Sequence, residues 1–437
     1  MRRNGRIILV VLLAAGAVGA LVSGERVYSQ LFAAGLILVS VMWLWTATSL
    51  WGLRVTRAAR SLKASVGDIL EENFEILNPT RLPRLWVEVV NAAPLPAAAG
   101  SRLFTLIRAH QRRFYLARTW LTQRGAFPLG PTVLTAGDPF GMFLTRRAIP
   151  NSQSLTVLPM LFNLTAFPTP QGALPGGQAI RRKASSVTTH AAGVREYATG
   201  DPMKSIHWQS TARRGRLIVK EFEQDPQAET WIFLDAHAEV HYALPQEENP
   251  ERFDELIFRR RQQIKLPPST IEYSVTLAAS LAHYFIAQHR AVGLVSAAQA
   301  LTVIPAERSV RQESKILETL AFINAAGDLP IAALAAAQAR YLPLGSSVVL
   351  VTPSTRSEAV LAIDEFQRRN LRPVMLLLDA STFGGHEGPD ALRQVVAARA
   401  VPLCLIRCGD DLSKTLAAFA AQAGRPPQVA TWRVAAL

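Results

Sequence analysis

The sequence predicts a multidomain chain with two N-terminal transmembrane helices, a β-sandwich-like module and a C-terminal α/β doubly wound domain. Three observations support this fold class. Two apolar runs open the chain, short apolar segments separated by turn residues follow, and the last half alternates apolar strands with amphipathic helices. With 437 residues, of which 49% are hydrophobic and 18% charged, the chain can form two or three units that each bury a core.

The two apolar runs cover about residues 7–22 and 31–51. Crossing the hydrocarbon of a bilayer takes about 20 apolar residues, and the second run meets this length. Its tryptophans suit an interfacial belt at one end; they are Trp43, Trp45 and Trp51. The first run is shorter and follows three arginines, so a cleaved signal peptide with a site at Ala15-Gly16-Ala17 is the alternative to an uncleaved hairpin.

Cations lie on both outer flanks of the two runs, while the loop between them holds only Glu25 and Arg26. Cytoplasmic flanks of membrane helices are enriched in Lys and Arg, so both ends of the hairpin are expected to face the cytoplasm. We therefore expect a multi-pass membrane protein with its soluble domains in the cytoplasm. The flanking cations are Arg2, Arg3 and Arg6 on one side and Arg54, Arg57, Arg60 and Lys63 on the other.

After the hairpin (residues 1–60), residues 61–160 contain short apolar stretches at roughly ten-residue spacing, with Pro, Gly and Asn between them. This rhythm predicts a small β-sandwich. Arg124-Gly125 and Asp138-Pro139-Phe140-Gly141 are predicted to form turns, since Gly permits positive φ and Asp-Pro favours turn initiation. Residues 161–192 are rich in Pro and Gly and are predicted to be a linker.

Residues 228–437 alternate buried strands with helices. Continuous apolar strands covered by helices imply a mostly parallel sheet, and the pair around residues 297–300 would add one antiparallel edge. The insert 241–270 is predicted to be a solvated excursion. The predicted strands are 231–234, 291–296, 301–304, 348–351, 374–378 and 402–406, and the predicted helices are 272–288, 310–324, 331–341 and 356–369.

The net charge of +14 and the isoelectric point near 10.4 favour acidic partners such as lipid headgroups, nucleic acid or an acidic protein. Only Cys404 and Cys408 occur, which excludes a disulfide framework and fits a reducing compartment. The sequence lacks a phosphate-binding Gly-rich loop, a His-Glu-x-x-His motif and a Gly-x-Ser-x-Gly motif, so the common enzyme classes that use them are excluded.

The segment 193–227 combines cations, a Gly-Asp turn and two large aromatic residues. It resembles the signature of a bacterial family known as domain of unknown function 58, which runs Gly-x-Arg-Glu-Tyr, Gly-Asp, Ile-x-Trp and Ala-Arg. The resemblance extends upstream to 124–131 and 138–143 and downstream to a domain similar to von Willebrand factor type A modules, covering most of residues 50–405. The matching positions are Gly193, Arg195, Glu196, Tyr197, Gly200, Asp201, His207, Trp208 and Arg213; His207 replaces a residue that is often Asp.

Three interpretations of this segment stay open. It could fasten the β module to the α/β domain, with Arg195 paired to Asp201 and the Trp208 ring buried against the sheet. It could be a basic recognition surface for an acidic partner. A Glu196/His207 pair could also do general acid–base work.

Type A modules hold a divalent ion with an Asp-x-Ser-x-Ser loop after the first strand. Here the corresponding loop contains Asp235, but His237 and Glu239 replace both hydroxyl residues. Mg²⁺ prefers oxygen ligands in tight octahedral geometry, so we expect a degenerate metal-ion-dependent adhesion site with no cofactor. Mg²⁺ binding, or a transition metal on the same three residues, is the alternative. Asp379, after the fifth apolar strand, is the distant carboxylate at this edge.

The resemblance implies partners, since members of this family commonly occur with MoxR-type AAA+ ATPases and with transglutaminase-like membrane proteins. We therefore expect a non-enzymatic adaptor in the bacterial inner membrane that works with such an ATPase in the assembly or remodelling of cell-envelope or other protein complexes. The alternative is a cryptic metal-dependent hydrolase using the Asp235/His237/Glu239 loop. Membrane lipids are an expected accessory partner, and specific nucleic-acid binding is not expected.

Overall fold

The computed structural model describes residues 2–23, 25–168, 191–198, 203, 206–222, 229–245 and 266–423. The chain divides into two units. The first contains Met1–Phe162, Ala243–Ser280 and Ser314–Asn324; the second contains Asn163–Tyr242, Leu281–Glu313 and Ala325–Leu437.

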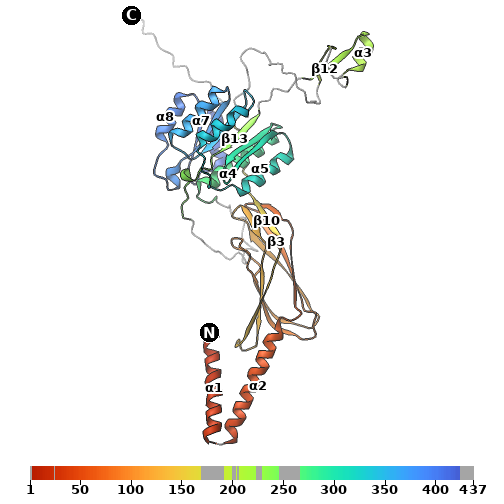
Figure 1. Ribbon diagram of the computed structural model, residues 1–437, viewed down its shortest axis with the longest axis vertical. Coiled ribbons are helices and arrows are strands. Elements are labelled where there is room, and N and C mark those ends of the chain that lie inside the picture. Colours follow the sequence, from red (N-terminus) through yellow and green to blue (C-terminus); the bar gives the residue numbers. More distant parts are fainter. Residues whose placement is uncertain are drawn as a thin grey trace. The chain divides into compact units, whose positions relative to one another are not determined.

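Two helices open the first unit, α1 (Arg2–Ser23) and α2 (Arg26–Ser49), and they pack against each other (Figure 1). Small residues permit the close approach of the two backbones. A Cβ at Gly19 of α1 would lie 2.5 Å from the Tyr28 ring of α2, and one at Gly35 of α2 would lie 2.7 Å from Leu13. Glycine at such contacts is typical of paired membrane helices.

Among the described residues, α2 is the helix that is long and apolar enough to cross a membrane, and it lies near the N-terminus, where a signal sequence has the same composition. The apolar part of α1 that the structure describes, Val10–Ser23, is shorter than a crossing requires. The expectation of a multi-pass chain is therefore corrected to one apolar span. The cause is the polar first turn of α1, which carries Arg2, Arg3 and Arg6.

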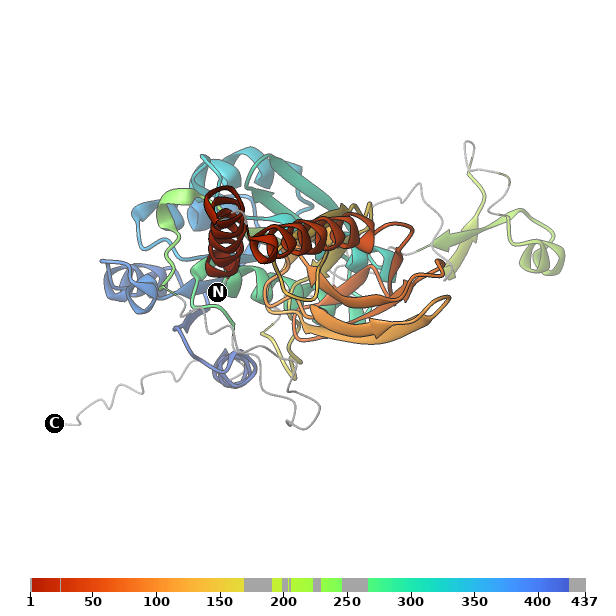
Figure 2. The same ribbon diagram turned by 90° about the horizontal axis from the view of Figure 1, so that it is seen from below.

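The end of α2 is built into the β module, which follows it directly (Figure 2). Leu50 and Leu53 lie in one hydrophobic cluster with Phe74 and Val87 of the module. Arg84, only 4% exposed, donates hydrogen bonds of 2.6 Å and 2.7 Å to the carbonyl oxygens of Thr48 and Trp51. The last carbonyls of a helix have no partners within the helix, and a cationic donor there also interacts favourably with the helix dipole. The helix and the module thus form one rigid joint.

The β module contains mostly antiparallel sheets, with strand orders β1-β3-β6, β5-β4-β8-β9 and β2-β10-β7. Alternating burial in β3 and β6 places one face of each strand on the core. The strands are β1 (Arg54–Ala59), β2 (Lys63–Ser65), β3 (Ile69–Leu77), β4 (Arg84–Asn91), β5 (Arg102–Ile107), β6 (Arg112–Trp120), β7 (Gly125–Pro128), β8 (Thr132–Gly137), β9 (Leu144–Ile149) and β10 (Ser154–Leu158).

The turn predicted at 138–141 is present, whereas Gly125 of the pair predicted at 124–125 is the first residue of strand β7. Gly141 has a φ of 69°, and its N–H donates to the Asp138 carbonyl oxygen. Gly125 begins β7 with a φ of 134°. The neighbouring Arg124 is buried, donates to the carbonyl oxygens of Leu320 (3.2 Å) and Ile323 (2.5 Å), and forms an ion pair with Glu272, all within the first unit. Arg124 thereby caps the C-terminal end of helix α5 (Val310–Phe322) as Arg84 caps α2.

Three of the four cations after the second apolar run are paired with acids. Arg57 and Glu72 form a buried bidentate ion pair at 2.7 Å and 2.9 Å. Arg60 binds Glu71, and Lys63 binds Glu318. These cations still bear on the expected orientation of α2, because orientation depends on the count of Lys and Arg in the flanking segments.

The second unit contains a mixed, mostly parallel sheet of six strands in the order β15-β14-β13-β16-β17-β18, with β15 antiparallel at one edge. Each predicted strand is present, and the central ones are buried on both faces. The strands are β13 (Thr230–Leu234), β14 (Val292–Ala297), β15 (Leu301–Glu307), β16 (Ser347–Thr352), β17 (Arg372–Leu378) and β18 (Leu403–Ile406).

Helices cover this sheet. Trp231 and Phe233 of β13 pack with Leu334, Phe366 and Val396, which belong to α6, α7 and α8. The helices packed in this cluster are α6 (Ile331–Gln338), α7 (Ser357–Arg368) and α8 (Asp390–Ala398). The same half of the chain also forms α4 (Thr270–Ala287) and α5 (Val310–Phe322), which are divided between the two units, and α9 (Leu412–Ala423). Short 3₁₀ turns lie at Ala238–Val240, Ala339–Tyr341 and Ala380–Phe383. Most of the insert predicted at 241–270 lies outside the described residues.

The signature segment forms a small element of its own within the second unit. Strands β11 (Ala191–Glu196) and β12 (Ile218–Phe222) pair antiparallel, and the short helix α3 (Trp208–Arg214) precedes β12. Its buried apolar side chains are Ile206, Ile218 and Val219. Gly215, with a φ of 66°, ends α3 in the left-handed conformation that glycine adopts without strain.

Candidate functional site

Asp235 lies directly after β13, at the carboxyl edge of the parallel strands, as the sequence predicts. Its carboxylate is buried and accepts a hydrogen bond of 2.6 Å from Thr352 Oγ1 and one of 3.1 Å from the His237 N–H. Burial raises the pKa of the Asp235 carboxyl from its ordinary 3.8 to about 6, because a low-dielectric site disfavours the charged form.

Thr352 is a site residue that the sequence analysis missed. It ends β16, which pairs with β13 so that Leu234 lies beside Val351. The residues that follow these two strands are therefore neighbours at the same edge. Thr352 Oγ1 also accepts a hydrogen bond of 2.9 Å from the Ser354 N–H, which fixes the loop after β16. A signal was present, since both apolar strands are followed at once by polar residues.

His237 and Glu239 do not join Asp235 in a shared cluster. Within the described part of the chain, no group of three or more His, Cys, Asp or Glu residues has metal-holding geometry. Glu239 instead forms an exposed ion pair of 2.8 Å with Arg356, which lowers the pKa of the Glu239 carboxyl. His237 is buried, and its Nδ1 has no hydrogen-bond partner among the described residues.

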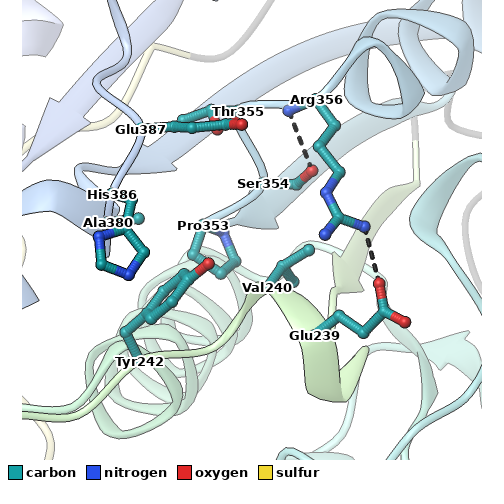
Figure 3. A pocket seen from close by; sticks show the side chains of 10 residues that line it. All are labelled: Glu239, Val240, Tyr242, Pro353, Ser354, Thr355, Arg356, Ala380, His386 and Glu387. Atoms are coloured by element: carbon teal, nitrogen blue, oxygen red, sulfur yellow. Dashed lines mark hydrogen bonds and ion pairs between the residues drawn. The ribbon is translucent and has the colours of Figure 1, made fainter. Parts of the chain in front are cut away.

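A cavity of about 140 Å³ lies between the loops that follow β13, β16 and β17. Figure 3 shows Arg356 reaching toward Glu239 on one side, with Tyr242 and His386 on the other. Two hydrogen bonds hold the loop after β16: Thr355 Oγ1 donates to Glu387 (2.9 Å), and the Arg356 N–H donates to Ser354 Oγ (3.3 Å). The lining residues are Glu239, Val240, Tyr242, Pro353, Ser354, Thr355, Arg356, Ala380, His386 and Glu387.

The size of this cavity restricts what it can bind. Sites for small molecules and cofactors usually measure about 300–1,000 Å³. A cavity of about 140 Å³ is about the size of a single side chain, and its lining is both cationic and acidic. It suits one inserted side chain of a protein partner, with Arg356 and Glu239 as charged groups at its border.

Asp379 follows β17 at the same edge, as predicted, but it has partners of its own. Ser381 Oγ donates to its carboxylate at 2.5 Å, and Arg407 lies 3.6 Å from it. The Thr382 hydroxyl accepts a hydrogen bond of 3.0 Å from the Cys408 N–H. The loop that carries Asp379 is therefore bonded to the loop that follows β18.

The signature residues fall in three places. Gly193 and Arg195 lie in β11, opposite Glu221 and Val219 of β12. The Tyr197 N–H donates to the Leu217 carbonyl oxygen at 3.0 Å. Gly200 and Asp201 lie outside the described residues, so the proposed pair between Arg195 and Asp201 stays a prediction.

Trp208 contradicts the expectation that its ring is buried against the sheet. It begins α3 and is 65% exposed, and Met203 and Leu217 are exposed as well. Among the side chains of this element that the structure describes, the buried apolar ones are Ile206, Ile218 and Val219. Arg213 in the last turn of α3 is also exposed, and no described acid pairs with it.

His207 and Glu196 have separate partners. His207 caps α3, with its Nδ1 2.7 Å from Ser210 Oγ and 3.2 Å from the Ser210 nitrogen. Glu196 forms an ion pair with Arg216. These contacts give His207 a structural role at the start of the helix, which is the ordinary use of a side-chain acceptor there.

Among the comparisons with known proteins, a family match covers the signature segment, and the structural similarities are weak. No curated protein matches the chain. The pilus adhesin SpaC of Lactobacillus rhamnosus GG, in its open conformation, is similar over 47% of this chain and 31% of the adhesin, with 9% identity and a TM-score of 0.29. The present chain thus corresponds to less than a third of that adhesin. An exo-β-N-acetylglucosaminidase of Vibrio harveyi aligns over 81% of each chain, with 10% identity and a TM-score of 0.19. Similarities of this size carry no argument about fold or function.

The family described as "Protein of unknown function DUF58" matches residues 193–256. This range includes the signature from Gly193 to Arg213 and continues through Asp235, His237 and Glu239. The chain therefore contains a DUF58 family domain at residues 193–256.

Proposed function

We propose that this protein is a non-enzymatic, membrane-anchored adaptor that binds a protein partner at the carboxyl edge of its α/β sheet. One observation carries the proposal. The carboxylates of Asp235 and Asp379 at this edge have partners within the protein, and an exposed Arg356–Glu239 ion pair borders a cavity large enough for a single side chain.

The anchor is α2. Its apolar length fits one bilayer crossing, and the cations that follow it favour the cytoplasmic side for the rest of the chain. We assign the protein to the bacterial inner membrane on this basis and on the family resemblance.

The sheet supports a von Willebrand type A-like domain. Five parallel strands with one antiparallel edge strand, and helices packed on the sheet, are the arrangement expected of such a domain. The antiparallel sheets between α2 and this domain fit a β-sandwich-like module. Ligands of open α/β sheets bind outside the carboxyl ends of the strands, which is where the cavity lies.

The partner proposed from the resemblance is a MoxR-type AAA+ ATPase, and a transglutaminase-like membrane protein is a second partner. The adaptor would then bring the ATPase to cell-envelope or other protein complexes. The exposed Trp208 and Arg213 give the partner a second contact region, because exposed aromatic and arginine side chains often dominate interface energetics.

The test is capture of partners from native membranes by the wild-type chain and by the Arg356→Glu variant. Charge reversal places a second acid beside Glu239, and we expect capture of the ATPase to fall roughly tenfold, as for an interface group worth about 1–2 kcal/mol.

Arg393→Glu is the matched control. Arg393 is an exposed arginine on α8 in an exposed ion pair with Asp390, 50% exposed against 44% for Arg356. Equal capture by the Arg356 and Arg393 variants would contradict the proposed site. Repeated absence of any AAA+ ATPase from captures by a folded chain would contradict the proposed partner.

A further inference from the structure

The β module has a rim at the end where α2 enters it. We define the rim as residues 50–54, 78–83, 106–112 and 138–143. Backbone and side-chain contacts bring these segments together. Arg54 of β1 pairs with Leu77 of β3, which pairs in turn with Arg112 of β6. Asn78 Nδ2 donates hydrogen bonds to the carbonyl oxygens of Leu82 and Arg108. The Trp86 indole N–H donates to the Asp138 carbonyl oxygen, and α2 contacts β8 and β9.

Large apolar side chains point out of this rim instead of into the core. Phe140 is 67% exposed and Trp51 is 73% exposed, and Leu82 and Leu106 are exposed as well. Single exposed apolar residues are ordinary on a protein surface, but four from four converging segments form a patch that marks an interaction surface.

The turn that carries Phe140 is held firmly. The buried Asp138 carboxylate accepts hydrogen bonds from the N–H groups of Phe140 (2.8 Å) and Phe143 (2.5 Å). The Gly141 N–H closes the turn on the Asp138 carbonyl oxygen at 3.2 Å. The local structure therefore fixes an exposed phenylalanine at the rim.

The charge of the rim has one sign. Its four segments contain four arginines, Arg54, Arg81, Arg108 and Arg112, and one acid, the fully buried Asp138. Arg112 forms an ion pair with Glu75 of β3, which lies outside the rim. Apolar and aromatic side chains beside the other three arginines, in segments without an exposed acid, match the region where acyl chains meet anionic headgroups.

We propose that the rim rests in the interfacial region of the bilayer, with Phe140, Leu82 and Trp51 among the upper acyl chains and the arginines against anionic lipid headgroups. The occupant follows from continuity with α2, because the Arg84 joint fixes the rim to the last turn of that helix. Trp43 and Trp45 lie in the last two turns of α2, toward the same end of the helix. This inference depends on α2 crossing the membrane, as proposed above.

The test uses the full chain in nanodiscs that contain phosphatidylglycerol, with Cys404→Ala and Cys408→Ser as background. A spin label is placed at Phe140→Cys, and access of oxygen is compared with access of a water-soluble nickel complex. Ile69→Cys is the matched control, since Ile69 is also exposed but lies eight positions away from Leu77 along β3, about 26 Å at the usual rise of a strand.

We expect position 140 to be more accessible to oxygen than to nickel, and position 69 to show the reverse. In discs of phosphatidylcholine alone the depth at position 140 should decrease, and Arg81→Glu with Arg108→Glu should remove this dependence on anionic lipid. Equal accessibility at the two positions would overturn the inference, and so would protection of position 140 from both reagents, which would mean that protein covers it.

Alkaline extraction of native membranes separates this result from the proposed anchor. If the chain resists extraction while position 140 behaves as position 69 does, α2 is an anchor and only the rim assignment is wrong. If extraction releases the chain, the membrane anchor and the rim assignment both fail.

Discussion

The carboxyl edge of the α/β sheet and the rim of the β module are both made of converging loops, but they expose opposite kinds of groups. At the edge, the polar groups of Asp235, Thr352 and Asp379 are buried and bonded within the protein. At the rim, Phe140 and Trp51 are exposed although the loops that carry them are well bonded. A loop that is well held by hydrogen bonds can therefore carry either buried or exposed side chains. The difference fits the two partners proposed above, a protein side chain at the edge and lipid at the rim.

The largest effect is expected from Arg84→Ala, which removes the hydrogen bonds that join the end of α2 to the β module. The variant loses two hydrogen bonds from a charged donor to the end of α2, each worth about 1.5–3 kcal/mol, and one to Thr80 Oγ1, so we expect the β module to lose at least about 4 kcal/mol of stability. Hydrogen exchange of β4 and β8 amides in detergent measures the change. Arg54→Ala, at an exposed arginine of the same rim, is the control, and an equal loss in both variants would refute the capping role.

Asp235→Asn tests whether the buried carboxyl at the edge makes the stability of the fold depend on pH. The carboxyl has a folded pKa of about 6 and an ordinary pKa of 3.8, so the folded state keeps a proton that the unfolded state releases between these values. Stability therefore falls as pH rises from about 4 to 6, by about 3 kcal/mol for a shift of roughly two units, and stays low above pH 6.

The asparagine variant should lack this slope in the exchange of β13 amides measured at pH 4.5 and pH 6.5. Asp390→Asn, at an exposed carboxylate on α8, should keep the wild-type slope. If the Asp235 variant retains it too, burial of this carboxyl does not control stability at the edge.

Trp208→Ala tests whether the signature segment shares in partner binding. The ring is exposed, so the variant should fold with a stability change within about 0.5 kcal/mol. Partner capture from membranes should nevertheless fall severalfold, since a contact aromatic is often worth more than 1 kcal/mol. Tyr341→Ala replaces another exposed aromatic, in the 3₁₀ turn after α6, and should leave capture unchanged.

The smallest effect is expected from Phe140→Ser in detergent without lipid discs. The side chain contributes little to the core, so the free energy of unfolding of the β module should change by no more than about 0.5 kcal/mol. A large loss would mean that Phe140 packs within the module, and the contrast between edge and rim would disappear.

The order of the α/β elements could be predicted because parallel central strands are buried on both faces and leave continuous apolar runs. The strand predicted at 348–351 is observed as Ser347–Thr352, and the helix predicted at 356–369 as Ser357–Arg368. The position of Asp235 at the strand end followed from the same pattern. The antiparallel edge strand was also predicted and is confirmed.

The contacts at the sites could not be predicted, because they join residues far apart in the sequence. The bond between Thr352 and Asp235 depends on which strands are neighbours in the sheet. Arg84 has no local pattern that points to the end of α2. The burial predicted for Trp208 was wrong: it depended on residue type alone, and the ring is exposed at the start of α3.

The joint at Arg84 has a mechanical consequence. A helix of 24 residues is about 36 Å long, while the hydrocarbon layer measures about 30 Å, and a helix that is too long for its bilayer leans over. Because Leu50 and Leu53 pack in the core of the module and Arg84 is bonded to the end of α2, we expect the inclination of the helix to be passed on to the β module. In a thinner membrane the β module would thus tilt toward the membrane surface, and in a thicker membrane it would stand closer to the membrane normal.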